Sequence, residues 1–324
     1  MAEVAFVPVQ TVEEAIQRLE GESPGQAALM AGGTDLLVRQ RQKLVSWRTL
    51  LYLKSVRSLS KIEFQGDGGW VLGAVATLDE VAHHPEIQRR FPMVAQAAAG
   101  VASPQVRHKA TLGGNICLES RCWFYNRSSY WRAEYPQCRK ASGGDRCDVL
   151  PKSRKGCFAL QSGDTVGPLV ALGAKLKLVS NEGERVIPIE DLYRGDGKDY
   201  LALDPHEILT HVLLQPSSTT GVFVKFRPQN NLDFATFTLS VIPPWAEGRS
   251  RIVVGSVASK PLRVRKAERL WDQGEGDARR IAMEAAKELR IVSFIRGSVE
   301  YKRKVIEAKL GEIITGLMKS SRFD

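Results

Sequence analysis

All five cysteines of this 324-residue chain lie between positions 117 and 157. Random placement would seldom give such clustering, and the reducing cytoplasm, where we expect the chain, disfavours structural disulfides. An odd number of cysteines also fits poorly with complete pairing. Thiolates are strong metal ligands. We therefore expect a bound metal ion or cluster here, rather than five cysteines that serve only as small buried hydrophobic side chains.

The spacing of these cysteines bears on which metal they hold. Structural zinc sites usually take ligands from close C-x2–4-C pairs. The close pair here, Cys117 and Cys122, has no second pair beside it. A [4Fe–4S] cluster accepts four thiolates from scattered positions and is a redox centre. The spacing favours a [4Fe–4S] cluster, with zinc as the alternative.

Two glycine pairs with neighbouring hydroxyl side chains indicate a second kind of site. They stand in AGGTDL, residues 31–36, and in ATLGGNIC, residues 110–117. Paired glycines can take positive φ and present successive N–H groups to an anion. Arg107, just before the second turn, could approach a phosphate. Neither turn matches the GxGxxG or P-loop pattern, but two such turns together predict the two sides of a dinucleotide pyrophosphate site.

The elements that carry these turns follow from the pattern of the chain. TVEEAIQRLE predicts a helix with Thr11 as its cap, a capping box to Glu14, and an end at Gly21. The next segment, 26–42, predicts a strand, the glycine turn and a helix, and residues 61–78 predict a hairpin. Residues 77–102 should be helical in two pieces. Later strands are expected in VFVKFRP, FATFTLSVI and SRIVVGSVA, and helices in DARRIAMEAAKEL and VEYKRKVIEAKLGEIITGLM. This mixed order predicts an α+β fold.

Composition and charge narrow the class of protein. With 43% hydrophobic and 25% charged residues, the chain can bury a sizeable core. It has no apolar run long enough for a membrane span, and its first residues are unlike a signal peptide, so we expect a cytoplasmic protein. The formal net charge is +10. Residues 118–157 carry nine Lys or Arg against four Asp or Glu, a net +5, and six aromatic residues.

This basic and aromatic stretch has two interpretations. Interleaved arginine and aromatic side chains can bind single-stranded nucleic acid, so a zinc-stabilised nucleic-acid module is one alternative. In the other interpretation, which we favour, the aromatic rings pack the loop and the basic side chains offset the negative charge of a cluster. A remaining surface charge could then attract an acidic electron carrier such as a ferredoxin. We accordingly expect no nucleic-acid partner.

Several motifs, in order, resemble one family. These are AGGTDLL, SPQVRHKATLGGNI, DTVGPLVALGAKLKLVS, EILTHVLLQP and KFRPQNNLDFA, followed by SVASKPLRVRKAE and SVEYKRKVIEAKL. Together they resemble the FAD-binding subunit of the xanthine dehydrogenase and carbon monoxide dehydrogenase family. The resemblance implies a two-subdomain FAD-binding domain of the PCMH type over 1–216, followed by a small C-terminal α+β domain, an antiparallel sheet with helices, over 217–324. His108 stands where the family often has asparagine, which alters a neighbour of the second turn but not the turn itself.

The resemblance also implies which residues hold FAD. It assigns no catalytic residue to this chain, because the cofactors carry the chemistry. By this likeness the first turn wraps the pyrophosphate, the second turn holds its other side, and three further residues lie toward the flavin. The residues so assigned are Leu29, Met30, Ala31, Gly32, Gly33, Thr34, Asp35, Leu36, Ser103, Thr111, Leu112, Gly113, Gly114, Asn115, Asp164, Leu209 and Lys225.

The cysteine-rich stretch is an insertion by comparison with that family. Ile116 and Asp164 are separated by 47 residues, where the family pattern has only about a dozen, and a long loop in a compact domain needs a physical reason. A flavin subunit with such a loop resembles that of the 4-hydroxybenzoyl-CoA reductase group. This likeness implies a [4Fe–4S] loop over 118–157. Its ligands would be Cys122, Cys138, Cys147 and Cys157, with Cys117 as a spare.

The function implied by this likeness is electron transfer within a larger oxidoreductase. Electrons would pass from a low-potential donor such as a ferredoxin through [4Fe–4S] and FAD to the partner subunits. Those partners would be a molybdopterin-containing large subunit and a [2Fe–2S] small subunit in a heterotrimer that could dimerise. The reaction would be reductive dehydroxylation of an aromatic CoA thioester, a step of anaerobic aromatic degradation. The alternative is the FAD subunit of another molybdenum hydroxylase, such as a xanthine, aldehyde or carbon monoxide dehydrogenase, with outward electron flow.

Overall fold

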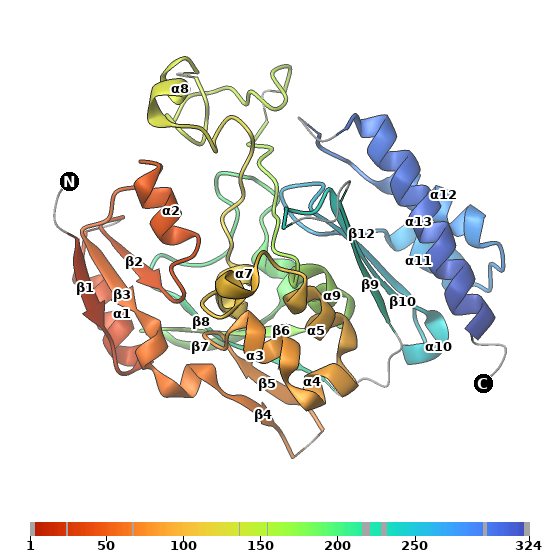
Figure 1. The fold of residues 1–324 in the computed structure, drawn as a ribbon, viewed down its shortest axis with the longest axis horizontal. Helices are drawn as coiled ribbons and strands as arrows, with labels where there is room; N and C mark the ends of the chain where they lie inside the picture. The colour runs from red at the N-terminus through yellow and green to blue at the C-terminus, as the bar shows by residue number, and fades with distance from the viewer. Residues whose placement is uncertain are drawn as a thin grey trace.

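The computed structural model describes residues 4–23, 25–66, 68–135, 137–153, 155–215, 221–227, 232–293 and 297–320. Within these ranges the strands form three sheets, each covered by helices, and an irregular segment projects from the body of the molecule (Figure 1). The expected α+β class is confirmed. No described helix is long and apolar enough to cross a membrane.

The N-terminal sheet is parallel and small. Its order is β1 (Ala5–Pro8), β3 (Thr49–Tyr52), β2 (Ala27–Met30). Helix α1 (Val12–Glu20) begins as predicted, because the Thr11 hydroxyl accepts from the Glu14 N–H, and Gly21 caps its end. The Glu14 carboxylate accepts from the N–H of Gln10 and not of Thr11, so the predicted capping box forms only on one side. Helix α2 (Leu36–Arg41) follows the first glycine turn.

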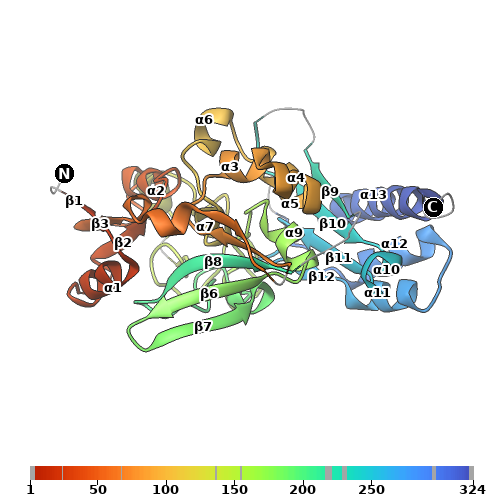
Figure 2. The same cartoon turned by 90° about the horizontal axis from the view of Figure 1, so that it is seen from below.

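The middle sheet has the order β4-β5-β8-β6-β7 and is antiparallel throughout. The hairpin expected at 61–78 is β4 and β5. Helices lie along one side of this sheet (Figure 2), and the apolar side chains between them form the largest core of the described residues. The strands are β4 (Ile62–Phe64), β5 (Trp70–Gly73), β6 (Lys175–Ser180), β7 (Gly183–Pro188) and β8 (Ile208–Leu214).

The helices beside the middle sheet correct one expectation. Residues 77–102 hold three helices and not two, α3 (Leu78–His83), α4 (Pro85–Arg90) and α5 (Pro92–Ala99). His84 breaks the first piece, because it takes an extended conformation before a proline. Two short helices, α6 (Pro104–Arg107) and α7 (Leu112–Ile116), carry the second glycine turn. Helix α9 (Val166–Ala171) is wholly buried and packs on the third sheet.

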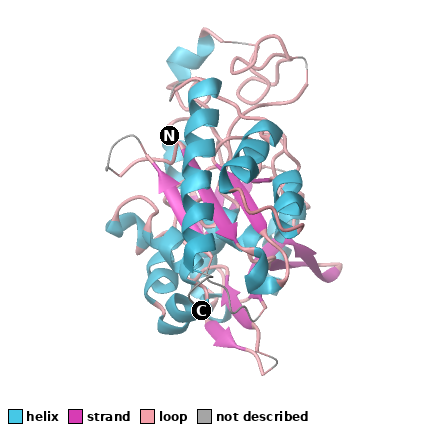
Figure 3. Cartoon of the chain, turned by 90° about the vertical axis from the view of Figure 1, so that its right-hand side faces the viewer, coloured by secondary structure: helices cyan, strands magenta, loops and turns pink. Residues whose placement is uncertain are grey.

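The C-terminal sheet is antiparallel with the order β12-β11-β10-β9. Its helices pack on one face, and the longest of them, α13, runs along the outside (Figure 3). Helix α11 is an element that the sequence patterns did not reveal. The elements are β9 (Val222–Phe226), β10 (Phe237–Ile242), α10 (Pro244–Glu247), β11 (Arg251–Gly255), β12 (Leu262–Arg263), α11 (Arg265–Asp272), α12 (Ala278–Glu288) and α13 (Val299–Ser320).

A buried carboxylate joins α11 to the C-terminal sheet. Glu268 lies 2.6 Å from the Arg263 guanidinium and accepts from the Ile252 N–H at 2.8 Å. Breaking a buried pair leaves an uncompensated charge. We expect Glu268→Ala to lower the free energy of unfolding by about 3 kcal/mol, measured by chemical unfolding of the full chain.

The matched control for this prediction is a carboxylate in an exposed ion pair. Glu312 lies 2.7 Å from Lys309 on the surface of α13, where both side chains are largely exposed. Glu312→Ala should cost at most about 1 kcal/mol, because water screens such pairs. Equal losses for the two variants would contradict a special role for Glu268.

Candidate functional site: a cofactor cleft and a four-cysteine insertion

The two glycine turns meet in space. A Cβ on Gly32 would lie 2.0 Å from the carbonyl oxygen of Lys109, so the backbone of the first turn packs directly on the residue before the second. Gly33 has a φ of +70°, which disfavours other residues. Thr34 and Gly114 are exposed. The two turns are adjacent, but Gly33 is the one glycine of the two pairs with a positive φ. The Gly113 and Gly114 N–H groups donate to the Ala74 carbonyl and the Thr111 hydroxyl, so the second pair does not present its N–H groups to a ligand as expected. That these turns hold a pyrophosphate stays a prediction.

The second turn is held from behind by segment 163–165. The Thr111 hydroxyl accepts from the Gly114 N–H and so caps α7. The Asn115 side-chain oxygen accepts from both the backbone N–H and the hydroxyl of Thr165, at 3.1 and 2.7 Å. Leu112 and Gly113 are buried, and a Cβ on Gly113 would lie 2.8 Å from Ala74. These contacts place Asp164 next to the turn.

Asp164 and Lys225 form a buried ion pair. The Lys225 ammonium lies 2.6 Å from one carboxylate oxygen of Asp164 and donates to the carbonyl oxygen of Gly100 at 2.9 Å. Burial raises the pKa of Asp164, and the charge of Lys225 opposes this shift. The other carboxylate oxygen is buried with no hydrogen-bond partner in the described structure. Such an orphaned acceptor beside the turns fits a site for a ligand donor.

The segment between Gly100 and the second turn is strained. Ala102 has a φ of +42°, in the region that favours glycine. Arg107 donates to the carbonyl oxygens of Val101 and Ala102 and so holds this bend. Arg107 therefore supports the backbone in this structure, instead of pointing a free charge at a phosphate. Ser103 is the N-cap of α6, with its hydroxyl accepting from Val106.

The remaining residues assigned to FAD belong to the elements beside these turns. Leu29 and Met30 end β2, Ala31 follows it, and Leu36 begins α2. Leu209 is buried in β8, the strand on which α7 packs. A cavity of about 380 Å³ opens between Asp35, the insertion and the C-terminal domain, and Asp35 is the one residue assigned to FAD among its described lining residues. Its lining includes Asp35, Arg121, Trp123, Phe234, Thr236 and Lys302.

The two ends of the insertion are joined by a short antiparallel bridge, which we call its base. Arg121 and Leu160 exchange backbone hydrogen bonds of 3.0 and 2.8 Å. Beyond this base the chain is mostly loop and turn, with one short helix, α8 (Ser129–Ala133), and it projects beyond the N-terminal and C-terminal parts (Figures 1 and 3). A loop of this length without regular structure has little of its own backbone to hold it together.

The four cysteines assigned as ligands are all buried in the insertion. Cys122 and Cys157 belong to one small apolar cluster with Tyr125 and Ala159. The Cys157 thiol forms a hydrogen bond with Cys147. Burial raises the pKa of Cys122, and nearby Cys138 and Cys147 add to this shift. The structure thus brings residues from across the loop into one neighbourhood.

Backbone N–H groups point at two of these sulfurs. Tyr125 donates to Cys122 Sγ at 3.3 Å, and Phe158 donates to Cys147 Sγ at 3.5 Å. The Cys157 thiol and the Phe158 N–H lower the pKa of Cys147 to about 6. Burial instead raises the pKa of Cys122 to about 11. N–H donors to sulfur stabilise thiolates, the form that binds metals.

The arrangement of the cysteines differs from a site for a single metal ion, and Cys117 lies apart from the other four. Among the residues that the structure describes, no three His, Cys, Asp or Glu side chains converge as ligands of a single metal ion would. Cys117 packs against the core of the middle sheet and not in the small apolar cluster of the insertion. Burial raises its pKa to about 12, which keeps it a neutral thiol. That Cys117 is not a ligand stays a prediction.

Comparison with known proteins decides the class of the cleft. The sequence matches the family described as the FAD binding domain in molybdopterin dehydrogenase over residues 2–216. The chain belongs to this family. The matched region includes both glycine turns, Asp164 and Leu209. FAD is therefore the cofactor of the family to which these residues belong. The resemblance seen in the sequence motifs is confirmed at family level.

Relatives and solved structures of this flavin family extend the match beyond the FAD domain. The aldehyde oxidoreductase FAD-binding subunit of Escherichia coli K12 is 29% identical over 260 residues, 78% of this chain and 80% of that protein. The nicotine 6-hydroxylase medium subunit of Paenarthrobacter nicotinovorans is 27% identical over 311 residues, 94% and 93% of the two chains. Quinoline 2-oxidoreductase from Pseudomonas putida 86 shares the fold, with a TM-score of 0.76 and 21% identity over 97% of this chain and 96% of that one.

The aromatic residues of the insertion pack on one another. Trp131 stacks on Tyr135 with ring centroids 4.4 Å apart and meets Trp123 edge-on at 4.9 Å. The Arg127 guanidinium lies over the Trp123 ring at 3.6 Å. Tyr130 is the exposed exception, at 85%. Rings used in this way stabilise the loop, as the favoured interpretation of this stretch expected.

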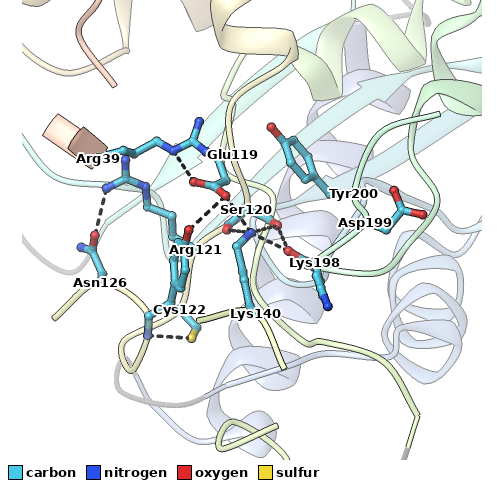
Figure 4. A network of polar contacts seen from close by, with 12 residues as sticks. Arg39, Glu119, Ser120, Arg121, Cys122, Asn126, Lys140, Lys198, Asp199 and Tyr200 are labelled. Atoms are coloured by element: carbon cyan, nitrogen blue, oxygen red, sulfur yellow. Dashed lines mark hydrogen bonds and ion pairs between the residues drawn. The ribbon is translucent and has the colours of Figure 1, made fainter. Parts of the chain in front are cut away.

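Sequence reasoning missed a partly buried ionic network at the root of this insertion (Figure 4). Arg121 lies 2.5 Å from Asp35 of the first turn, and Arg39 of α2 lies 2.5 Å from Glu119. Lys140 lies 3.3 Å from Glu119. Burial raises the pKa of Asp35 and lowers that of Lys140, and in each case the opposite charges nearby oppose the shift. No local motif marks these residues, because they are joined only by the tertiary fold.

Proposed function

We propose that this chain carries FAD and a [4Fe–4S] cluster and transfers electrons between them within a molybdenum hydroxylase-type complex. Family membership supports FAD and the class of flavin subunit. The observation that carries the cluster is the set of four buried cysteines in an irregular insertion, with backbone N–H groups directed at two of the sulfurs. In a cubane each cysteine binds a different iron, so the four thiols need not converge on one point.

When bound, FAD exchanges one or two electrons and an iron–sulfur cluster exchanges one at a time, so together they can form a relay. The role of the protein is to hold the two cofactors near each other and to exclude water from them. The glycine turns, Asp164 and Lys225 would hold FAD at the cleft. Cys122, Cys138, Cys147 and Cys157 would hold the cluster, and the packed rings beside them would exclude water.

The partners proposed are the other two subunits of such a complex. Relatives carry the names "medium subunit" and "medium chain" in nicotine 6-hydroxylase and carbon monoxide dehydrogenase. By this likeness we place the chain beside a molybdopterin-containing large subunit and a [2Fe–2S] small subunit. A low-potential acidic carrier such as a ferredoxin would reach the basic insertion, whose net charge over residues 118–157 is +5.

Two substrate classes follow from different observations. The names of the relatives refer to aldehyde, xanthine, nicotine and carbon monoxide, which favours a hydroxylase or dehydrogenase with outward electron flow. The inserted cysteine loop favours the second candidate, reduction of 4-hydroxybenzoyl-CoA with electrons entering through the cluster. We take the first as the better supported class and the second as the specific hypothesis that the insertion raises.

The purified complex tests these proposals directly. We expect flavin absorption with a broad iron–sulfur shoulder, and about four irons in this subunit. Reduced viologen should drive turnover of 4-hydroxybenzoyl-CoA if electrons flow inward. Oxidation of purines, aldehydes or N-heteroaromatic compounds with an artificial acceptor would instead assign the hydroxylase class. Zinc in place of iron, or a spectrum with flavin bands and no iron–sulfur absorption, would contradict the proposed cluster.

A further inference from the structure

A buried lysine joins the cysteine insertion to the rest of the flavin domain. The Lys140 ammonium donates to the carbonyl oxygens of Ser120 and Gly197, each at 2.6 Å. Only 4% of its side chain is exposed. Tyr125 and Tyr200 present their rings to it at 4.9 and 5.2 Å. Figure 4 shows Lys140 beside Glu119 and Ser120 at the root of the insertion, with Tyr200 of the loop at 194–201 nearby.

Lys140 is also close to a proposed cluster ligand. The Gly197 N–H donates to the carbonyl oxygen of Cys157 at 2.7 Å, while the Gly197 carbonyl accepts from Lys140. The Cys157 N–H in turn donates to Asp196 at 3.0 Å. One residue, Gly197, therefore separates the lysine from the backbone of Cys157. In the low dielectric of a buried site, a charge at this range acts strongly on its neighbours.

The ion pairs at the root of the insertion carry an excess positive charge. They contain three cations, Arg39, Arg121 and Lys140, and two carboxylates, Asp35 and Glu119, so these five side chains sum to +1. The Asp196 carboxylate, which accepts from the Cys157 N–H, lies outside these pairs. Arg121 and Asp35 face each other at 2.5 Å, and Glu119 is shared by Arg39 and Lys140. Glu119 also accepts from the Tyr125 hydroxyl. The charge that the carboxylates leave uncompensated thus lies between the first glycine turn and the cysteine loop.

We infer that Lys140 is a positioning residue for electron transfer, which fixes the cysteine loop to the flavin domain and, through its buried charge, favours the reduced form of the cluster. The inference rests on the proposed [4Fe–4S] cluster. Reduction adds one negative charge to a cluster, so a nearby fixed cation raises its reduction potential and a nearby carboxylate lowers it. Glu119 should therefore act in the opposite direction to Lys140.

Redox titration of the cluster in the intact complex, followed by electron paramagnetic resonance, tests this. Lys140→Gln should shift the reduction equilibrium about tenfold toward the oxidised form, which is about 59 mV to lower potential for one electron. Glu119→Gln should raise the potential. Lys140→Arg should stay close to the unaltered protein, because it keeps the charge. Opposite shifts are the decisive readout, because simple loosening of the loop would move both glutamine variants in the same direction.

The control lies in the same loop. Lys152 is exposed, so water should screen its charge, and Lys152→Gln should move the potential much less than Lys140→Gln. If Lys140→Gln loses its iron on purification, Glu119→Gln and Lys140→Arg still carry the test. If the reduction potentials of Lys140→Gln and Glu119→Gln shift in the same direction, or do not shift, in a protein that holds four irons, the inference about Lys140 is overturned and the proposed cluster is not. Absence of iron from the unaltered protein would overturn the proposed cluster as well.

Discussion

Gly32→Ala should strip most of the FAD from this subunit. A methyl group at this position would meet the Lys109 carbonyl oxygen at 2.0 Å and its carbon at 2.5 Å, and both are backbone atoms that cannot rotate away. The two glycine turns would have to move apart, and overpacking of this kind costs about 1–3 kcal/mol. FAD affinity should fall about tenfold to a hundredfold, since about 1.4 kcal/mol corresponds to one factor of ten. Flavin content and fluorescence titration of the apoprotein with FAD measure the loss.

Gly21→Ala is the matched control for this variant. Gly21 lies in the same N-terminal subdomain, and a methyl group there would make an ordinary contact of 3.5 Å with the carbonyl oxygen of Gln17. This variant should retain its flavin. Circular dichroism of both proteins should show an intact fold, which separates a local effect on the turns from unfolding. Unchanged FAD affinity in folded Gly32→Ala would remove the turns from the proposed pyrophosphate site.

Cys147→Ser should abolish the cluster and leave the flavin. Cys147 is buried, and its sulfur accepts a hydrogen bond from the Phe158 N–H and forms another with the Cys157 thiol. Its sulfur therefore lies among the groups that would surround the irons. A serine oxygen is a hard ligand that replaces a soft thiolate poorly. Iron and acid-labile sulfide should drop to a small fraction of the unaltered values. FAD should remain, because both glycine turns lie in the body of the protein and not in the insertion.

Cys117→Ser separates a ligand role from a general effect of removing a cysteine. Cys117 packs on the middle-sheet core, apart from the small cluster that contains Cys122 and Cys157. This variant should keep its full complement of iron and sulfide. Loss of iron from Cys117→Ser with retention in Cys147→Ser would show that the ligand set was assigned wrongly.

The cofactor cleft is the part of this protein most open to prediction from sequence. Glycine pairs, hydroxyl neighbours and the strand before each turn are local features, and they stand within a few residues of one another. Thr11 capping α1 and the hairpin of β4 and β5 were predictable for the same reason. Local patterns failed where neighbours in space decided the outcome. Helix α11, for example, is joined to the C-terminal sheet by Glu268, which accepts from the Ile252 N–H.

What the sequence by itself determined here is the inventory of chemical groups: two glycine pairs beside hydroxyl side chains, a long inserted loop and four cysteines inside it. Only the tertiary structure decided which of them meet. It placed the two turns in direct backbone contact, gave Arg107 a supporting role, and formed the ion pairs of Asp35 with Arg121 and of Glu119 with Lys140. The physical reason is that ion pairs between distant segments have no sequence period. Their energy depends on burial and separation, which exist only after the chain has folded.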